Sequence, residues 1–60
     1  MTNAEERLLV YLYTEKGSSR NEIWSKVRGL FKSRKGLNAA LENLKKEGFI
    51  REINKSFFKN

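Results

Sequence analysis

The 60-residue sequence predicts a small α+β domain that is mainly α-helical, with three helices followed by a short β wing of two or three strands. Three stretches combine a polar cap with apolar residues at three- and four-residue spacing, which is typical of amphipathic helices. After residue 48 the pattern changes to short apolar runs separated by a turn, which is typical of a hairpin. The length allows one domain, residues 1–60, that removes only about 60% of its unfolded-state surface from water.

The first predicted helix begins within residues 2–5, where a threonine and a glutamate have the spacing of a capping box. Gly17 is placed to end this helix. Val10 and Tyr13 lie off its apolar stripe; scattered exposed apolar residues are ordinary, and the alternative is a homodimer contact through this helix. The stripe itself, which Leu9 widens, consists of Ala4, Leu8, Tyr11 and Leu12.

The second predicted helix repeats the capping-box spacing at Ser19 and Glu22 and ends at Gly29. Trp24 lies at the edge of its apolar stripe, where the ring packs while the indole N–H stays in water. We therefore interpret Trp24 as a residue at the edge of the core rather than as a base-stacking residue. The stripe consists of Ile23 and Val27.

The third predicted helix has both of its ends marked. Ser33 is placed as the N-cap, and Gly48 is placed for the left-handed residue after the last turn. Lys45 and Lys46 complement the negative end of the helix dipole. The apolar stripe, which we expect to meet every other element, consists of Leu37, Ala40, Leu41 and Leu44.

A hairpin is predicted from strand-like residues 49–53 and 57–59 around a turn. A two-residue loop would place Arg51 opposite Phe58, and a three-residue loop would place Ile53 opposite Phe57. We prefer the three-residue loop because it pairs more apolar surface. Lys55 lies at the tip in both cases.

The net charge of +6 is unevenly distributed. Residues 1–19 hold two cations and three glutamates, a sum of −1, whereas residues 20–60 hold eleven cations and four glutamates, a sum of +7. The positive field therefore belongs to the second and third helices and the hairpin, which indicates a polyanionic partner. The alternative is that the lysines only keep a small protein in solution.

Composition also limits the classes of function. The chain contains no His, no Cys and no Asp, so the usual nucleophile–base pairs and most metal sites cannot be built; we expect neither an enzyme nor a cofactor. No apolar run approaches the roughly 20 residues that span a bilayer, and we expect no membrane partner. With no cysteine, the composition is compatible with a reducing interior, and we expect a cytoplasmic protein.

The string LNAALENLKKEGFI, residues 37–50, resembles the end of the recognition helix and the start of the wing in winged helix-turn-helix DNA-binding domains. Residues 21–50 are also similar to winged-helix modules at the C-terminal ends of plasmid and phage primase-helicases. The resemblance implies binding to double-stranded DNA through the third helix and the wing, in transcription regulation or mobile-element DNA replication, with a larger replication protein as a further partner. It also implies a short third strand at residues 30–31.

Helix 33–48 begins with features that suit an anion, because its first turn offers free amides, the positive end of the dipole, two cations and a side-chain amide. Gly36 either lets a DNA backbone approach closely or relaxes a crowded turn. Ala39 offers base edges only a methyl group, so direct readout falls mainly on Asn38. Together with the resemblance, this predicts as nucleic-acid contacts Arg20, Arg34, Lys35, Gly36, Asn38, Ala39, Glu42, Asn43, Lys46, Arg51 and Lys55.

Two other functions are compatible with the same residues. A winged helix can dock an acidic protein surface with the same cations, and the salt dependence of nucleic-acid affinity distinguishes the two. RNA binding is less favoured, because the aromatic pair at residues 57–58 lacks the spaced stacking residues of common RNA-binding sheets.

Overall fold

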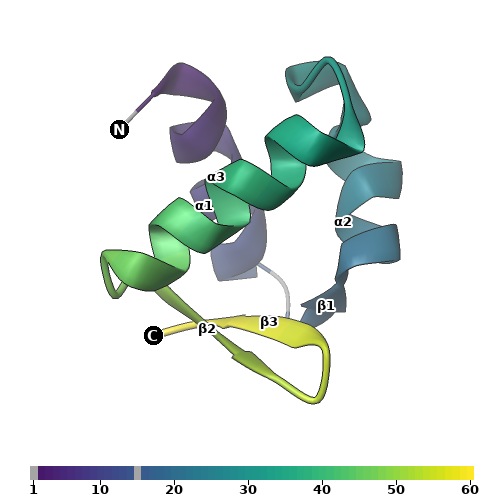
Figure 1. Ribbon diagram of the computed structural model, residues 1–60. Helices are drawn as coiled ribbons and strands as arrows, with labels where there is room; N and C mark the ends of the chain where they lie inside the picture. The colour runs from purple at the N-terminus through teal and green to yellow at the C-terminus, as the bar shows by residue number, and fades with distance from the viewer. Residues whose placement is uncertain (1, 15) are drawn as a thin grey trace.

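The computed structural model of the chain describes residues 2–14 and 16–60. In Figure 1, α3 crosses the front of the molecule between α1 and α2, and the sheet closes the domain below the helices. This arrangement confirms the predicted α+β, mainly helical class and has the layout of a winged helix-turn-helix. No helix in the described residues is long and apolar enough to cross a bilayer. The elements are α1 (Asn3–Thr14), β1 (Ser18–Ser19), α2 (Arg20–Val27), the 3₁₀ turn η1 (Arg28–Leu30), α3 (Arg34–Lys46), β2 (Ile50–Ile53) and β3 (Ser56–Lys59).

Both predicted capping boxes are present. The Glu5 backbone N–H donates to Thr2 Oγ1 at 3.2 Å, and Glu5 Oε1 accepts from the Thr2 N–H at 2.9 Å. The same reciprocal pair joins Ser19 and Glu22 at the start of α2. These contacts satisfy amides that have no partner within the helix, which is why a four-residue pattern suffices to predict where each helix begins.

The ends of α3 also follow the sequence. Ser33 Oγ accepts from the Gly36 N–H at 3.3 Å, and Gly48 takes the left-handed conformation at φ 86°. After the last turn, the Gly48 N–H donates to the Lys45 carbonyl and the Phe49 N–H donates to the Leu44 carbonyl. This pair of bonds is a Schellman motif, which turns the chain directly from α3 into β2.

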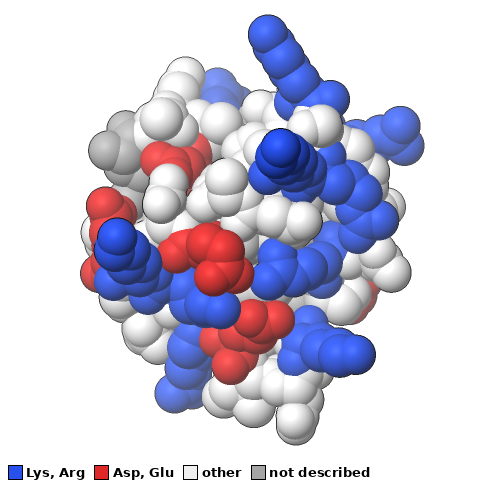
Figure 2. Space-filling model, in the orientation of Figure 1, with Lys and Arg blue, Asp and Glu red and all other residues white. Residues whose placement is uncertain are grey.

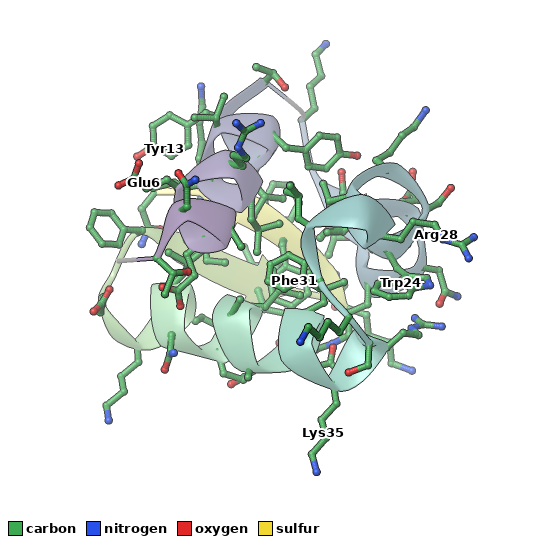
Figure 3. The ribbon with its side chains drawn as sticks, turned by 90° about the horizontal axis from the view of Figure 1, so that it is seen from above. Glu6, Tyr13, Trp24, Arg28, Phe31 and Lys35 are labelled. Carbon is green, nitrogen blue, oxygen red and sulfur yellow. The ribbon has the colours of Figure 1, made fainter. Side chains whose placement is uncertain are left out.

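The core lies between the three helices and the sheet. Leu41 is fully buried at its centre, as predicted, and Trp24 is partly buried at its edge. Phe31, which Figure 3 shows between the helices, packs against the same core. The buried apolar side chains are Leu8, Leu12, Ile23, Val27, Leu37, Ala40, Leu41, Leu44, Ile50 and Phe57.

The third strand does not come from the predicted segment. The sheet is antiparallel in the order β1-β3-β2, and β1 pairs Ser18 with Phe57. Leu30 instead ends η1, while Phe31 is extended but turns its ring into the core beside the helices. Gly17, at φ 142°, leads into this strand and lies so close to the sheet that a Cβ there would be 2.5 Å from the Phe58 ring.

The preferred hairpin register was wrong. Arg51 pairs with Phe58 across a two-residue turn, and both turn residues, Asn54 and Lys55, have positive φ, as in a type I′ turn. This register puts Ile50 on the core side of the sheet and leaves Ile53 47% exposed. The Schellman motif at the end of α3 directs Ile50 inward. The register of the three-residue loop would turn Ile50 outward, because successive side chains of a strand point to opposite faces.

Leu41→Ala should lower the free energy of unfolding by about 2–5 kcal/mol, because it leaves a cavity at the centre of a small core. Urea denaturation followed by circular dichroism measures this. Ala39→Ser, on the exposed side of the same helix, is the control and should change stability by less than about 0.5 kcal/mol. Equal stability of Leu41→Ala and the unmodified chain would contradict the central position of Leu41.

Candidate nucleic-acid interface

A surface network of four charges occupies the middle of the predicted binding face. This ionic cluster consists of Arg20 at the start of α2, Glu42 and Lys45 on α3, and Glu52 on β2. Arg20 Nη2 lies 3.1 Å from Glu42 Oε2 and 3.8 Å from Glu52 Oε1. Lys45 Nζ lies 3.3 Å from Glu42 Oε2 and 3.0 Å from Glu52 Oε1. Two cations and two carboxylates cancel, so this part of the face carries no net charge (Figure 2).

The same contacts hold the cluster in its charged form. Hydrogen bonds from Arg20 and then from Lys45 lower the pKa of Glu42. Hydrogen bonds to Glu52 and then to Glu42 raise the pKa of Lys45. Exposed ion pairs of this kind add little to stability. Their main effect is to orient the hairpin against α3 and to neutralise charges that would otherwise face a ligand.

Arg20 and Asn38, both predicted to contact DNA, are bonded to each other. Arg20 Nη1 donates to Asn38 Oδ1 at 2.7 Å, and the guanidinium lies over the Phe57 ring, 4.9 Å from its centroid. Bidentate recognition of adenine uses both the oxygen and the nitrogen of an asparagine side chain. Asn38 therefore has to give up its bond to Arg20 before it can bind a base in that way.

Two further predicted contacts point away from the exposed side of α3. Asn43 Nδ2 donates to Glu5 Oε2 at 3.3 Å and so ties α3 to α1. Arg51 lies on the opposite face of the hairpin from Glu52, in a hollow that it shares with Lys59. Neither side chain joins the first turns of α3, and their placement argues against a role in binding there.

The remaining predicted residues are exposed at the start of α3 and at the wing tip. Arg34 donates a hydrogen bond to Asn21 Oδ1 at the start of α2, and with Lys55 it lines one hollow between α2, α3 and the wing. Lys35 points away from the body of the protein (Figure 3). Within residues 2–14 and 16–60, no carboxylate forms an ion pair with these three cations. Ala39 and Lys46 are exposed farther along α3.

The wing tip keeps its cation at a conformational cost. Lys55 has φ 66°, in the left-handed region that an L-residue occupies at a cost of about 1–2 kcal/mol. A type I′ turn is most favourable with glycine at this second position, after an asparagine such as Asn54. The chain carries lysine where glycine would make the better turn, which is consistent with a use for the charge at the tip.

Gly36 is not required by packing. A Cβ at this position would meet Phe31 at 3.8 Å and Ser33 Oγ at 4.0 Å, both ordinary contact distances. The first turn of α3 is therefore not crowded, which removes one of the two explanations for this glycine. The other, close approach of a ligand to the backbone, remains consistent with its exposed position.

Sequence reasoning missed two features of this surface. Glu42 and Lys45 are three residues apart on one helix, a spacing that can indicate an ion pair, but their partners Arg20 and Glu52 come from other elements. The second feature is a segment, residues 23–41, that carries cations but no acidic residue. The charge pattern of the sequence already showed it. The five cations of this segment are Lys26, Arg28, Lys32, Arg34 and Lys35.

Comparisons with protein families, with curated proteins and with solved structures find no match to this chain. The geometry and charge of the described residues are therefore what indicates a function for this chain.

Gly36→Ala should raise the free energy of unfolding by up to about 1 kcal/mol, because alanine favours the helix and the added methyl group has space. The same change should weaken duplex DNA binding if a ligand backbone approaches this turn. Thermal denaturation and anisotropy titration measure the two effects separately. Gly29→Ala, where no atom lies within 4 Å of the added Cβ, is the control. A more stable variant with unchanged DNA affinity would exclude close approach at Gly36.

Proposed function

We propose that this chain binds double-stranded DNA as a winged-helix module, mainly by phosphate contacts, in transcription regulation or mobile-element replication. The observation that carries the proposal is the position of Arg34, Lys35 and Lys55, three exposed cations around one side of the molecule that have no carboxylate partner among the described residues. Arg34 and Lys55 border the same hollow although 21 positions separate them in the chain. Glu52 also lines this hollow, but its carboxylate is already paired with Arg20 and Lys45. A phosphate backbone at this hollow would meet cations from α3 and from the wing.

The distribution of charge along α3 indicates which part of the helix contacts phosphates. The ionic cluster neutralises the middle of the helix, whereas the first turn keeps its cations and the backbone amides that Ser33 does not cap. Phosphates are therefore favoured at the N-terminal part of α3, where the helix dipole is also positive. This distribution supports contact by the start of α3 and the wing tip rather than along the whole helix.

Duplex binding should weaken steeply with salt, because each phosphate neutralised releases condensed counterions and contributes a slope of about −0.9 to the plot of log affinity against log salt. Lys35→Gln and Lys55→Gly should each reduce that slope by about 1. Lys55→Gly should also raise the melting temperature, since glycine relieves the left-handed strain. Anisotropy titration of labelled duplex at several salt concentrations tests this, with Lys16→Gln, on another face, as the control.

Unchanged duplex affinity in both variants, with the fold intact, would contradict the proposed interface. Docking of an acidic protein surface would then become the better explanation for these cations.

Sequence specificity should be modest. Ala39 offers a single methyl group, and Asn38 already uses its amide oxygen, so the isolated domain lacks a free bidentate amide contact at these two positions of α3. Selection from a random duplex library should give only a short, weakly enriched motif, and Asn38→Ala should change it little. A long, strongly enriched motif that is lost in Asn38→Ala would show that Arg20 releases this side chain on binding.

A further inference from the structure

A second positive surface lies where α2, η1 and the start of α3 meet. We call it the basic corner and define it by Trp24, Lys26, Arg28 and Lys32. All three cations are exposed, and no ion pair in the described parts of the chain involves them. Figure 2 shows blue side chains gathered at this upper right part of the molecule. None of these residues belongs to the duplex contacts proposed above.

Local structure explains only part of this charge. Lys26 lies in the last turn of α2 and Arg28 directly follows the helix, where cations interact favourably with the helix dipole. Lys32 lies beyond η1, in the connection to α3, and caps neither helix. Glu22 precedes Lys26 by four positions on α2 but forms no ion pair with it in the described residues, and positions 23–41 contain no acidic residue. The concentration of three cations here indicates a polyanion at the corner as well.

The basic corner also contains an aromatic surface. Trp24 is only partly buried, and the Arg28 guanidinium lies over its ring, 6.0 Å from the centroid. Figure 3 shows the two side chains next to each other at the outer edge of α2. A partly exposed indole with an arginine beside it provides stacking and charge together, the combination that single-strand-binding proteins use for successive bases and phosphates.

The directions of the Lys35 and Arg28 side chains indicate whether the basic corner binds duplex or single-stranded DNA. Lys35 points outward from α3, whereas Arg28 points outward from α2, around the edge of the molecule (Figure 3). The whole domain measures only 25 × 22 × 19 Å. A duplex with a persistence length of about 50 nm does not bend around an edge of this size without a large cost. A flexible single strand makes the turn easily.

We propose that the basic corner binds a single-stranded DNA segment continuous with the duplex at α3 and the wing, so that the protein recognises a duplex with a single-stranded tail. A base of the tail stacks on the part of the Trp24 ring that stays outside the core, a role that the sequence by itself did not favour for this residue. Arg28 moves off the ring on binding and, with Lys32, contacts the phosphates of the tail. The inference rests on the proposed duplex function for its starting point. It adds a ligand class and a site that duplex binding does not require.

Trp24 is the only tryptophan in the chain, so its fluorescence reports on this site directly. The probes are a blunt duplex, the same duplex with a tail of roughly eight nucleotides, and the tail alone, a length within the site sizes of single-strand-binding domains. The tail should raise duplex affinity roughly tenfold, the order expected for one stacked base, and quench Trp24 emission. The blunt duplex should leave the emission nearly unchanged.

The double variant Arg28→Gln/Lys32→Gln should lose the gain from the tail and keep the affinity for blunt duplex. Arg7→Gln/Lys16→Gln removes the same net charge from exposed positions outside the corner and should keep that gain. Equal affinity for tailed and blunt duplexes, or a gain that survives Arg28→Gln/Lys32→Gln, would overturn the proposal. Failure of the blunt duplex to bind would instead refute the duplex function, and quenching by the free tail would then support the corner by itself.

Discussion

The buried ring of Phe57 is the contact on which the arrangement of this small domain depends. Phe57 lies in the central strand, paired with Ser18 on one side and with Glu52 on the other, and its ring is in the same core as Leu41. Arg20 covers the ring from the start of α2. One side chain therefore joins the wing to the helices, and both the third strand and the hairpin register follow from keeping it inside.

The fold decides which of the charges outside this core pair with each other and which stay unpaired. Four of them, from three different elements, cancel in the ionic cluster beside Phe57. Exposed pairs contribute little to the free energy of folding, so the cluster matters chiefly for the field that it leaves behind. That field is neutral over the middle of α3 and positive at its start, at the wing tip and at the basic corner.

Two positions depart from what local stability would favour. Gly36 lies in a helix with room for a side chain, and Lys55 occupies a left-handed turn position suited to glycine. Departures of this kind are expected where function and not folding selects the residue. Both lie on the side of the molecule where we propose that phosphates bind, and this agreement was not visible before the turn geometry and the packing around α3 were known.

The sequence by itself determined the features that arise within a few residues. The capping boxes at Thr2 and Ser19, the stripe around Leu41 and the left-handed Gly48 all depend on neighbours in the chain, and all are as predicted. The cations at the start of α3 and at residue 55, which were predicted to contact nucleic acid, are exposed.

Only the tertiary structure decided which distant residues meet. The third strand comes from residues 18–19 and not 30–31, because the start of α2 lies beside β3 while Phe31 is drawn into the core. Arg20 meets Asn38 and Glu42 across 18 and 22 positions, which changed three predicted DNA contacts into parts of an internal network. Such pairings depend on how the helices and the sheet pack together. The spacing of apolar residues along the chain predicts each element separately, and it carries no information about which charges of different elements meet.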